Sequence, residues 1–333
     1  MKNEFFRWLG RSTLLLIGIG SFSLLDSWGL YLQVHKVDQE SPEEFRLLLS
    51  RWKETGVRGV FLRTFQNHDD RLHSLRPRGS DIGVYFENTL GMPVVYPLLE
   101  TLHSPLPLYA WTTLRWMDWE EGRRYGHYLD PRQPRTRSRM LSLVSTLSDK
   151  PLAGILLQDD LVVRSAEEKE LRWKDKGAFL NRLLQEIKSR SGDREVVINV
   201  FYEVPTRPDL GTRWYGQQID SLLASGADSI ALMLYPLQIK EELHLSDEEL
   251  RLYMERTLQA LEPHAARTYV KVQVQDFKSL QPVPPETVEG WIRLIPTKFK
   301  GVVLTPITTD SASMQYLDSL LTRLLPPSSS ALP

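Results

Sequence analysis

Cysteine is absent from the 333-residue sequence. This absence excludes disulfides, thiolate metal sites, a cysteine nucleophile and a lipoprotein anchor on cysteine, but it does not identify the compartment, because many exported proteins also lack cysteine. An excess of positive or negative charge is also lacking: the formal net charge is −1, and no basic stripe stands out. A near-neutral chain has no general field for nucleic acid, so we predict no nucleic-acid partner and a ligand captured by a local site.

Motifs that would indicate a cofactor are missing as well. No glycine-rich phosphate loop follows an apolar run, since Gly18 and Gly20 lie in the N-terminal leader. There is no Ser-His-Asp ordering and no His/Asp/Glu spacing that demands a metal. We therefore predict no cofactor and no metal, with one alternative left open, in which His35 and Asp38 join His68 as metal ligands.

Aromatic residues are plentiful, with 9 tryptophans and 12 tyrosines among a hydrophobic content of 41%. Most such rings fill a core. The same rings also form the surfaces on which sugars stack, because an aromatic face is easily desolvated against C–H groups. Three tryptophans, Trp111, Trp116 and Trp119, cluster in one stretch, and exposure of at least one of them would favour a sugar groove.

Residues 1–28 differ from the rest of the chain. Lys2, Arg7 and Arg11 precede an apolar run over residues 13–25, which is typical of a signal peptide or an N-terminal membrane anchor. The run is short for a full membrane span, which needs about 20 residues. We expect a periplasmic or extracytoplasmic protein, anchored to the inner membrane if the segment is retained. The alternative is a buried N-terminal helix that plugs the bottom of the fold.

From Gly29 onward, apolar strand-like runs alternate with amphipathic helical stretches. The first helix shows the pattern, with Ser41 as a capping residue, Pro42 at the first position and Glu44 three residues after the cap. Unbroken apolar runs are expected of parallel strands, which are covered on both faces. The expected strands are 30–34, 59–65, 108–114, 154–157, 196–201, 229–234, 269–274 and 301–304. The expected later helices are 94–102, 136–147, 174–189, 215–225, 247–261, 286–294 and 313–324.

This alternation predicts an α/β fold, a (β/α)8 TIM-type barrel that forms a single domain over residues 29–325, followed by a disordered tail at 326–333. A doubly wound open sheet is the runner-up. In a barrel, the residues that follow the strands share the C-terminal face, where active sites are built. The candidate substrate-binding residues there are His35, Asp38, Arg63, Gln66, Trp111, Trp116, Tyr202, Glu203, Tyr235, Gln273, Gln275 and Asp276.

Asp159 and Asp160 give the strongest local signal and are the candidate catalytic residues. The stretch Gly154-Ile-Leu-Leu-Gln-Asp-Asp runs from an apolar strand straight into two acids. Adjacent like charges at a dry rim raise the pKa of one acid unless hydrogen bonds or a cation compensate, and a protonated carboxyl is the general acid of glycosidic cleavage. The competing interpretation is a helix cap. Neighbouring side chains diverge, so one acid should face substrate while the other orients a partner, with Asp159 preferred as the acid.

Several stretches carry a resemblance to a known family. The chain resembles the C-terminal glycoside hydrolase domain of the bacterial PgaB-type poly-β-1,6-N-acetylglucosamine deacetylases, over about residues 30–308. The matching stretches are Gly59-Val-Phe-Leu-Arg-Thr-Phe, Val84-Tyr-Phe-Glu-Asn, Leu108-Tyr-Ala-Trp-Thr, Gly154-Ile-Leu-Leu-Gln-Asp-Asp, Asn199-Val-Phe-Tyr, Met233-Leu-Tyr-Pro and Lys271-Val-Gln-Val-Gln-Asp-Phe.

The resemblance implies a barrel that cleaves partly de-N-acetylated poly-N-acetylglucosamine, an exported biofilm polysaccharide. It implies catalysis by Asp159 and Asp160, and a sugar groove lined by Trp111, Tyr235 and Gln275. Where the family commonly has His-Asp-Asp, this chain has Gln158 before the two acids, and a tryptophan after the seventh strand is replaced by Phe277. We expect a stand-alone barrel without the deacetylase domain.

Three functional hypotheses follow. The first is a glycoside hydrolase of an exported amino-sugar polysaccharide. The second is a non-catalytic polysaccharide-binding barrel that assists export or the biofilm matrix. The third is a metal-assisted barrel hydrolase. The expected partners are the polysaccharide, the exopolysaccharide export machinery and, through residues 13–25, a membrane. The second carboxylate that would work with Asp159 is left open among Asp38, Glu203 and Asp276.

Overall fold

The structure is a computed structural model that describes residues 29–37, 42–64, 103–115, 124–125 and 128–325. The expected leader at 1–28, the helix at 94–102 and the tail at 326–333 lie outside these residues. Of the helices in the described ranges, none has both the length and the apolar character that crossing a bilayer requires.

Eight parallel strands close into a barrel, in the order β1-β10-β9-β8-β7-β6-β3-β2. The closed order confirms the predicted (β/α)8 architecture and makes the open-sheet alternative wrong. The strands are β1 (Gly29–Lys36), β2 (Val57–Arg63), β3 (Leu108–Thr112), β6 (Gly154–Leu157), β7 (Glu195–Phe201), β8 (Ser229–Met233), β9 (Thr268–Gln273) and β10 (Gly301–Thr308). A short antiparallel pair, β4 (Arg124–Tyr125) and β5 (Tyr128–Leu129), lies between β3 and β6 in the chain.

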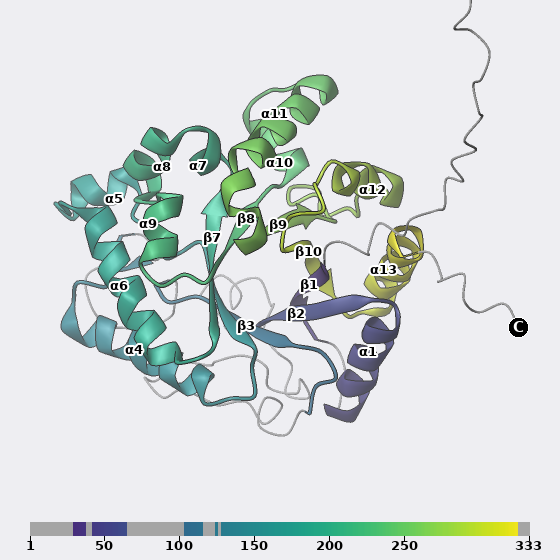
Figure 1. Cartoon of the computed structure of the whole chain (residues 1–333), viewed down its shortest axis with the longest axis horizontal. Helices are drawn as coiled ribbons and strands as arrows, with labels where there is room; N and C mark the ends of the chain where they lie inside the picture. The colour runs from purple at the N-terminus through teal and green to yellow at the C-terminus, as the bar shows by residue number, and fades with distance from the viewer. Residues whose placement is uncertain (1–28, 38–41, 65–102, 116–123, 126–127, 326–333) are drawn as a thin grey trace, which may run out of the picture.

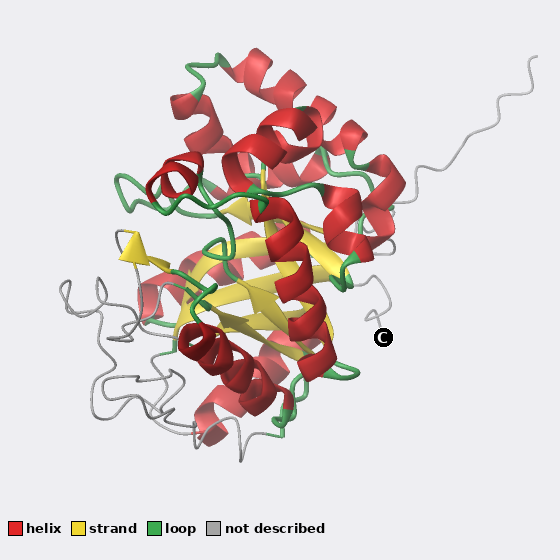
Figure 2. Ribbon diagram, turned by 90° about the vertical axis from the view of Figure 1, so that its left-hand side faces the viewer, coloured by secondary structure: helices red, strands yellow, loops and turns green. Residues whose placement is uncertain are grey.

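Helices surround the barrel (Figure 1), and the strands occupy its centre (Figure 2). The longer helices are α1 (Pro42–Glu54), α4 (Pro134–Ser148), α6 (Lys176–Ser191), α11 (Asp247–Ala260), α12 (Pro285–Arg293) and α13 (Ser311–Leu324). The shorter ones are α5 (Ser165–Glu170), α7 (Glu203–Thr206), α8 (Pro208–Tyr215), α9 (Ile219–Ala224), α10 (Pro236–Glu242) and the 3₁₀ helix η1 (Glu262–Arg267).

The helix expected at 215–225 is in fact the end of α8 followed by α9. Gly216 has φ = 73°, a left-handed conformation that ends α8. By contrast, α11 begins with a complete capping box, in which Ser246 and Glu249 satisfy each other's backbone N–H groups. Asp310 caps α13 by accepting hydrogen bonds from the backbone N–H groups of Ala312 and Ser313. Local sequence therefore fixes where these helices begin and end.

Aromatic rings fill the N-terminal end of the barrel. The ring centroid of Tyr31 lies 5.0 Å from that of Tyr269 and 6.4 Å from that of Tyr109. Glycines on the neighbouring strands make room for these rings: a Cβ at Gly301 would lie 2.6 Å from the Tyr31 ring. At Gly154, a Cβ would lie 2.4 Å from the backbone oxygen of Glu195. The bottom of the barrel is thus closed by rings that only glycine neighbours admit.

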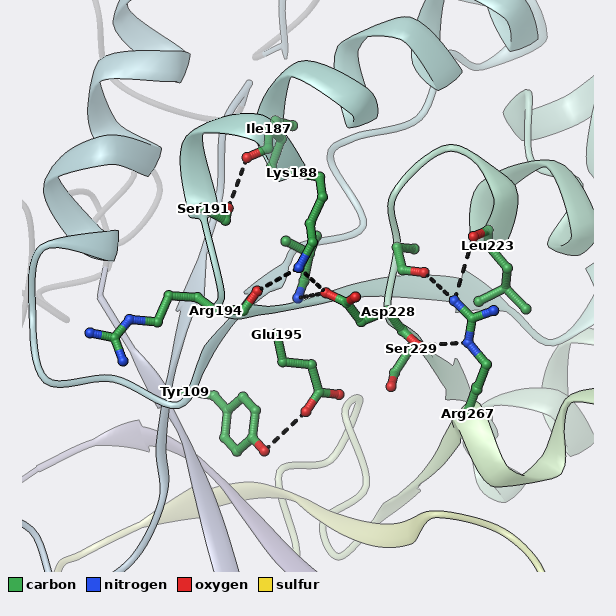
Figure 3. Close-up of polar contacts among 12 residues, drawn as sticks. Tyr109, Ile187, Lys188, Ser191, Arg194, Glu195, Leu223, Asp228, Ser229 and Arg267 are labelled. Carbon is green, nitrogen blue, oxygen red and sulfur yellow. Dashed lines mark hydrogen bonds and ion pairs between the residues drawn. The ribbon is translucent and has the colours of Figure 1, made fainter.

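Ion pairs and hydrogen bonds surround this aromatic plug. The Glu195 carboxylate accepts hydrogen bonds from Tyr109 Oη (3.2 Å) and from Lys300 Nζ (2.6 Å). Figure 3 shows the adjoining contacts, including Lys188 Nζ, which donates to Asp228 Oδ2 over 2.7 Å and ties α6 to the start of β8. In TIM-type barrels this face serves stability, whereas chemistry belongs to the opposite face.

The substitution Gly154→Ala should destabilise the barrel by about 2 kcal/mol, since the added methyl group overlaps backbone that cannot move without widening the β6–β7 pair. Denaturant unfolding of the two proteins measures the difference. The matched control is Gly290→Ala in the exposed part of α12, where an added Cβ meets nothing within 4 Å. That control should be neutral or stabilise by up to about 1 kcal/mol. Equal stability of Gly154→Ala and wild type would contradict the packing argument.

Candidate active site at the barrel mouth

The Asp159–Asp160 pair follows β6 directly, at the C-terminal end of the barrel. Asp159 is half-buried and Asp160 is buried. Neither residue caps a helix, because the next helix, α5, begins at Ser165 and Arg164 is its N-cap. The structure therefore excludes the helix-cap interpretation and leaves the two acids at the rim.

Asp160 anchors the end of β6 to the end of β3. Its carboxylate accepts hydrogen bonds from the Thr113 hydroxyl, from Leu114 N (2.9 Å) and from Arg115 N (2.5 Å). The side chain is 1% exposed. Its polar partners are thus backbone and hydroxyl groups of the β3 loop, as expected for the member of the pair that orients its surroundings.

Arg115 continues this anchor below the rim. The side chain is fully buried, forms an ion pair with Glu167 on α5, and donates from Nε to the Leu129 carbonyl over 2.8 Å. It also donates to the Asp160 carbonyl over 3.3 Å. Burial raises the pKa of Glu167, and Arg115 opposes that rise. Arg115 therefore holds three loops together and is not directed at a ligand.

A chain of hydrogen bonds crosses the mouth beneath Asp159. The side-chain oxygen of Gln158 accepts from the Trp111 indole N–H and from Asn199 Nδ2 (3.3 Å). Asn199 in turn accepts a hydrogen bond from Lys271 Nζ over 3.2 Å. The Lys271 nitrogen also lies 5.7 Å from the ring centroid of Tyr235. Strands β3, β6, β7 and β9 are joined in this way immediately below the acid.

Asp159 is the carboxyl of the pair that faces this polar floor. Burial raises the pKa of Asp159 above its usual range, and Lys271 and Arg164 oppose the rise without cancelling it. Burial also raises the pKa of Tyr235 well above its ordinary value, and the charge of Asp159 adds to the effect. A carboxyl that stays protonated closer to neutral pH, beside a tyrosine that stays neutral, is suited to general acid catalysis.

His35 and Arg63 complete the opposite side of the mouth. The His35 ring lies 4.4 Å from the Trp111 ring, and its Nε2 is 3.5 Å from Thr305 Oγ1. Burial lowers the pKa of His35 well below its ordinary value, and the charges of Arg63 and Lys271 lower it further. His35 is therefore a neutral imidazole at neutral pH, available as a hydrogen-bonding group.

A shallow cavity of about 200 Å³ opens beside Tyr235 at the end of β9. The Tyr235 and Phe277 rings meet edge to face with centroids 5.1 Å apart, and Phe277 is 40% exposed. The cavity is lined by Gln238, Glu241, Gln273, Asp276, Phe277 and Lys278. An exposed aromatic ring among amides and charged groups has the composition of a sugar-binding surface.

The polar residues after β9 shape this loop. The side-chain amide oxygen of Gln273 accepts from two backbone N–H groups at the start of α10. Gln275 donates to the carbonyl of Leu280 over 2.7 Å. The Asp276 carboxylate accepts from the Ser279 hydroxyl over 2.6 Å, which lowers the pKa of Asp276. Gln273 and Asp276 line the cavity, while Gln275 holds the turn.

Two predicted residues have side chains that contact helices. Tyr202 is buried, donates to Glu242 on α10 over 2.6 Å and packs against Tyr253 on α11. Glu203 begins α7 and accepts a hydrogen bond from Tyr215 Oη over 3.1 Å. Burial raises the pKa of Glu203. The contacts of Tyr202 and Glu203 thus join the segment after β7 to α8, α10 and α11.

Three other predicted residues, Asp38, Gln66 and Trp116, lie outside the described residues, as do His68 and Trp119. Trp111 is 3% exposed and forms part of the floor of the mouth. The expectation of an exposed tryptophan therefore depends on Trp116 and Trp119 alone. Within the described ranges there is no group of three or more His, Asp or Glu side chains that could hold a metal.

Sequence reasoning missed Lys271, which is buried in the barrel with 1% exposure. A signal for it existed, because Lys271 is the charged residue within the apolar run of β9, and it alternates in phase with Gln273. Arg164 was also missed. It stands in an irregular loop, where no periodic pattern directs attention to it.

No family model matches the sequence, and no curated protein matches it either. Solved structures do match. The chain is similar in fold to the PgaB (BpsB) glycoside hydrolase domain of Bordetella bronchiseptica. The TM-score is 0.65 at 16% identity, over 90% of this chain and 99% of that domain. The resemblance inferred from the sequence is thus confirmed for the fold.

Two mannanases share the same barrel. The endo-1,4-β-mannanase of Rhizomucor miehei gives a TM-score of 0.51 at 11% identity, over 90% of this chain and 94% of that one. The endo-1,4-β-D-mannanase of Thermotoga petrophila gives 0.50 at 12% identity, over 86% of this chain and 90% of that one. At these identities the likeness concerns the fold.

The two acids should differ in their effect on stability. Asp160→Ala should lower the free energy of unfolding by about 3 kcal/mol, because it leaves the buried N–H and hydroxyl groups of the β3 loop without their acceptor. Asp159→Asn should leave stability at pH 7 unchanged or higher. The reason is that the pKa of Asp159 is higher in the folded state than in the unfolded state. Its contribution to the free energy of unfolding is therefore favourable below the unfolded pKa and is lost as the pH rises through the folded pKa. Guanidinium unfolding at pH 7 measures both variants, and equal losses would refute the division of roles.

Proposed function

We propose that this chain is a glycoside hydrolase acting on an exported amino-sugar polysaccharide, such as partly de-N-acetylated poly-β-1,6-N-acetylglucosamine, with Asp159 as general acid. The observation that carries the proposal is the half-buried Asp159 carboxyl at the C-terminal mouth of a (β/α)8 barrel, with its pKa raised by burial. The fold shared with the PgaB glycoside hydrolase domain supports the same reaction class.

The proposed chemistry begins with proton transfer from Asp159 to the glycosidic oxygen as the bond to the anomeric carbon breaks. The leaving sugar takes that proton and departs as an alcohol, while Asp159 becomes a carboxylate. The oxygen of a water molecule ends up bonded to the anomeric carbon, and the proton that this water loses restores the protonated acid. Neutral His35 and Tyr235, at the two sides of the mouth, serve as hydrogen-bonding groups for sugar hydroxyls. Asp160 assists through position, because its hydrogen bonds to the β3 loop fix the backbone from which Asp159 projects.

Binding of the polymer is assigned to the surface beside Asp159. Phe277 offers an exposed ring face, Tyr235 buttresses that ring, and the adjoining cavity supplies amide and carboxylate groups. One sugar would stack on Phe277 while its hydroxyls bond to the cavity lining. A ring face of this kind contributes to the free energy of binding mainly because it desolvates the C–H face of a sugar.

Of the three candidates for the second carboxylate, Glu203 is bonded to Tyr215, and Asp276 is held in its own turn. A carboxylate with one such hydrogen bond can still accept another, so the proposal keeps Asp38, Glu203 and Asp276 as candidates. The hydrogen bonds that already engage Glu203 and Asp276 also favour a second candidate function, a polysaccharide-binding barrel without turnover. Export of the chain by residues 1–28 and association with export machinery belong to the proposal in either case.

Asp159→Asn should abolish cleavage of partly de-N-acetylated poly-N-acetylglucosamine, with a loss of at least about 100-fold, because the amide cannot donate the proton. Product masses and new reducing ends measure cleavage, and unfolding curves establish that the variant is folded. If Asp159→Asn retained cleavage, Asp159 would not be the general acid. Wild-type binding without any product would favour the binding barrel, and loss of cleavage with a chelator would favour a metal-assisted hydrolase.

Phe277→Ala should weaken binding of oligosaccharides about tenfold, because the stacking surface is lost while the polar lining stays. Calorimetric titration of wild type and variant gives the two dissociation constants. Leu252→Ala is the control, since Leu252 is a comparably exposed apolar side chain, at 37%, and lies on α11 rather than in the turn that carries Phe277. An unchanged affinity for Phe277→Ala would remove this surface from the binding site.

A further inference from the structure

Lys271 is a cation built into the interior of the barrel. It lies on β9 in register with Val303 of β10 and Met233 of β8, and 1% of its surface is exposed. Its ammonium group donates to the amide oxygen of Asn199 rather than to a carboxylate. Burying an ammonium without direct pairing costs several kcal/mol, so a compensating charge or a functional reason is expected nearby.

The nearby compensating charge is the Asp159 carboxyl. Asn199 accepts from Lys271 and donates to Gln158, the residue that precedes Asp159. The chain of amides that begins at the ammonium group thus ends at Gln158, the residue next to Asp159 in the sequence. The ammonium and the carboxyl attract each other electrostatically, and Lys271 is the strongest influence that lowers the pKa of Asp159.

We propose that Lys271 is a positioning residue whose ammonium group controls the charge of the Asp159 carboxyl. The inference deepens the proposed glycosidase function and rests on it for the role of Asp159 as an acid. Lys271 acts on Asp159 through its charge, from a buried position in the barrel. Its charge stabilises the carboxylate that remains when Asp159 has given its proton to the leaving sugar.

Among the described residues, the other groups that interact electrostatically with Asp159 or Lys271, or with His35 beside them, do not change state near neutral pH. His35 on β1 is neutral because burial lowers its pKa well below the ordinary value. Arg63 on β2 and Arg164 before α5 are guanidinium groups, which stay charged. Burial raises the pKa of Tyr128 on β5 and that of Tyr235 after β8, so both phenols stay protonated.

Lys271 itself titrates in the relevant range. Burial lowers the pKa of Lys271 to about 7, and the charge of Asp159 opposes that shift. As the pH falls below about 7, Lys271 becomes fully charged and makes Asp159 a stronger acid. Removing the ammonium should therefore raise the pKa of Asp159 and weaken it as an acid.

The first experiment follows the Asp159 carboxyl carbon by NMR titration in selectively ¹³C-labelled protein, assigned by its loss in Asp159→Asn. Lys271→Met should raise the pKa of Asp159 by about one unit, the size of effect that a nearby opposite charge produces. Lys271→Arg should keep it at or below the wild-type value. The control is Lys300→Met, which removes an ammonium from the opposite end of the barrel and should leave Asp159 unmoved.

The reciprocal experiment does not depend on a folded Lys271 variant. The ε-carbon signal of Lys271 is titrated in wild type and in Asp159→Asn, and loss of the carboxylate should lower the pKa of Lys271 by about one unit. An Asp159 titration that is unchanged in Lys271→Met, or a Lys271 titration that is unchanged in Asp159→Asn, would overturn the inference.

Kinetic measurements distinguish a role of Lys271 in controlling Asp159 from a role of Lys271 in packing alone. In Lys271→Met the alkaline limb of kcat/KM should move up by about one pH unit, and kcat should fall about tenfold with KM within twofold. A fall at every pH with an unmoved limb would indicate packing alone and would overturn the inference. Coupled titrations in a protein that cleaves no glycan would support the Lys271–Asp159 link while contradicting the proposed hydrolase.

Discussion

The carboxylate of Asp160 is the constraint on which the mouth of the barrel depends. It accepts hydrogen bonds from two backbone N–H groups and one hydroxyl of the β3 loop, all in a buried position. The backbone hydrogen bonds between parallel strands stop where the strands end. Without such an anchor, the residues that follow β6 would therefore be free to fray. With the anchor in place, the preceding residue, Asp159, projects from a fixed backbone.

The neighbouring acids therefore divide two tasks that a single carboxylate could not perform. An anchoring carboxylate needs hydrogen-bond donors around it, whereas a general acid needs an environment that favours its protonated form. Asp160 has the donors for the first task, since three groups of the β3 loop donate to its Oδ2, and Asp159, whose pKa is raised by burial, suits the second. The two residues are adjacent in the sequence, so a shift of the Asp160 backbone would move Asp159 by a comparable distance.

The barrel could be predicted from sequence because its strands are covered on both faces and read as unbroken apolar runs. The strand at 154–157 was predicted with the bounds that the structure gives. The short helices α7 and α10 were missed because four and seven residues carry too little periodicity. Asp160 was recognisable as an acid but not as an anchor, since its partners lie 45 to 47 residues earlier in the chain. The buried position of Lys271 required the inward alternation of β9, which only the closed barrel establishes.

The aromatic plug at the N-terminal end has a consequence for any polymer that binds. Tyr31, Tyr109 and Tyr269 fill the barrel, and their glycine neighbours leave no passage along its axis. No chain can pass through such a barrel, so the polymer of the proposed function would bind and leave on the face that carries Asp159.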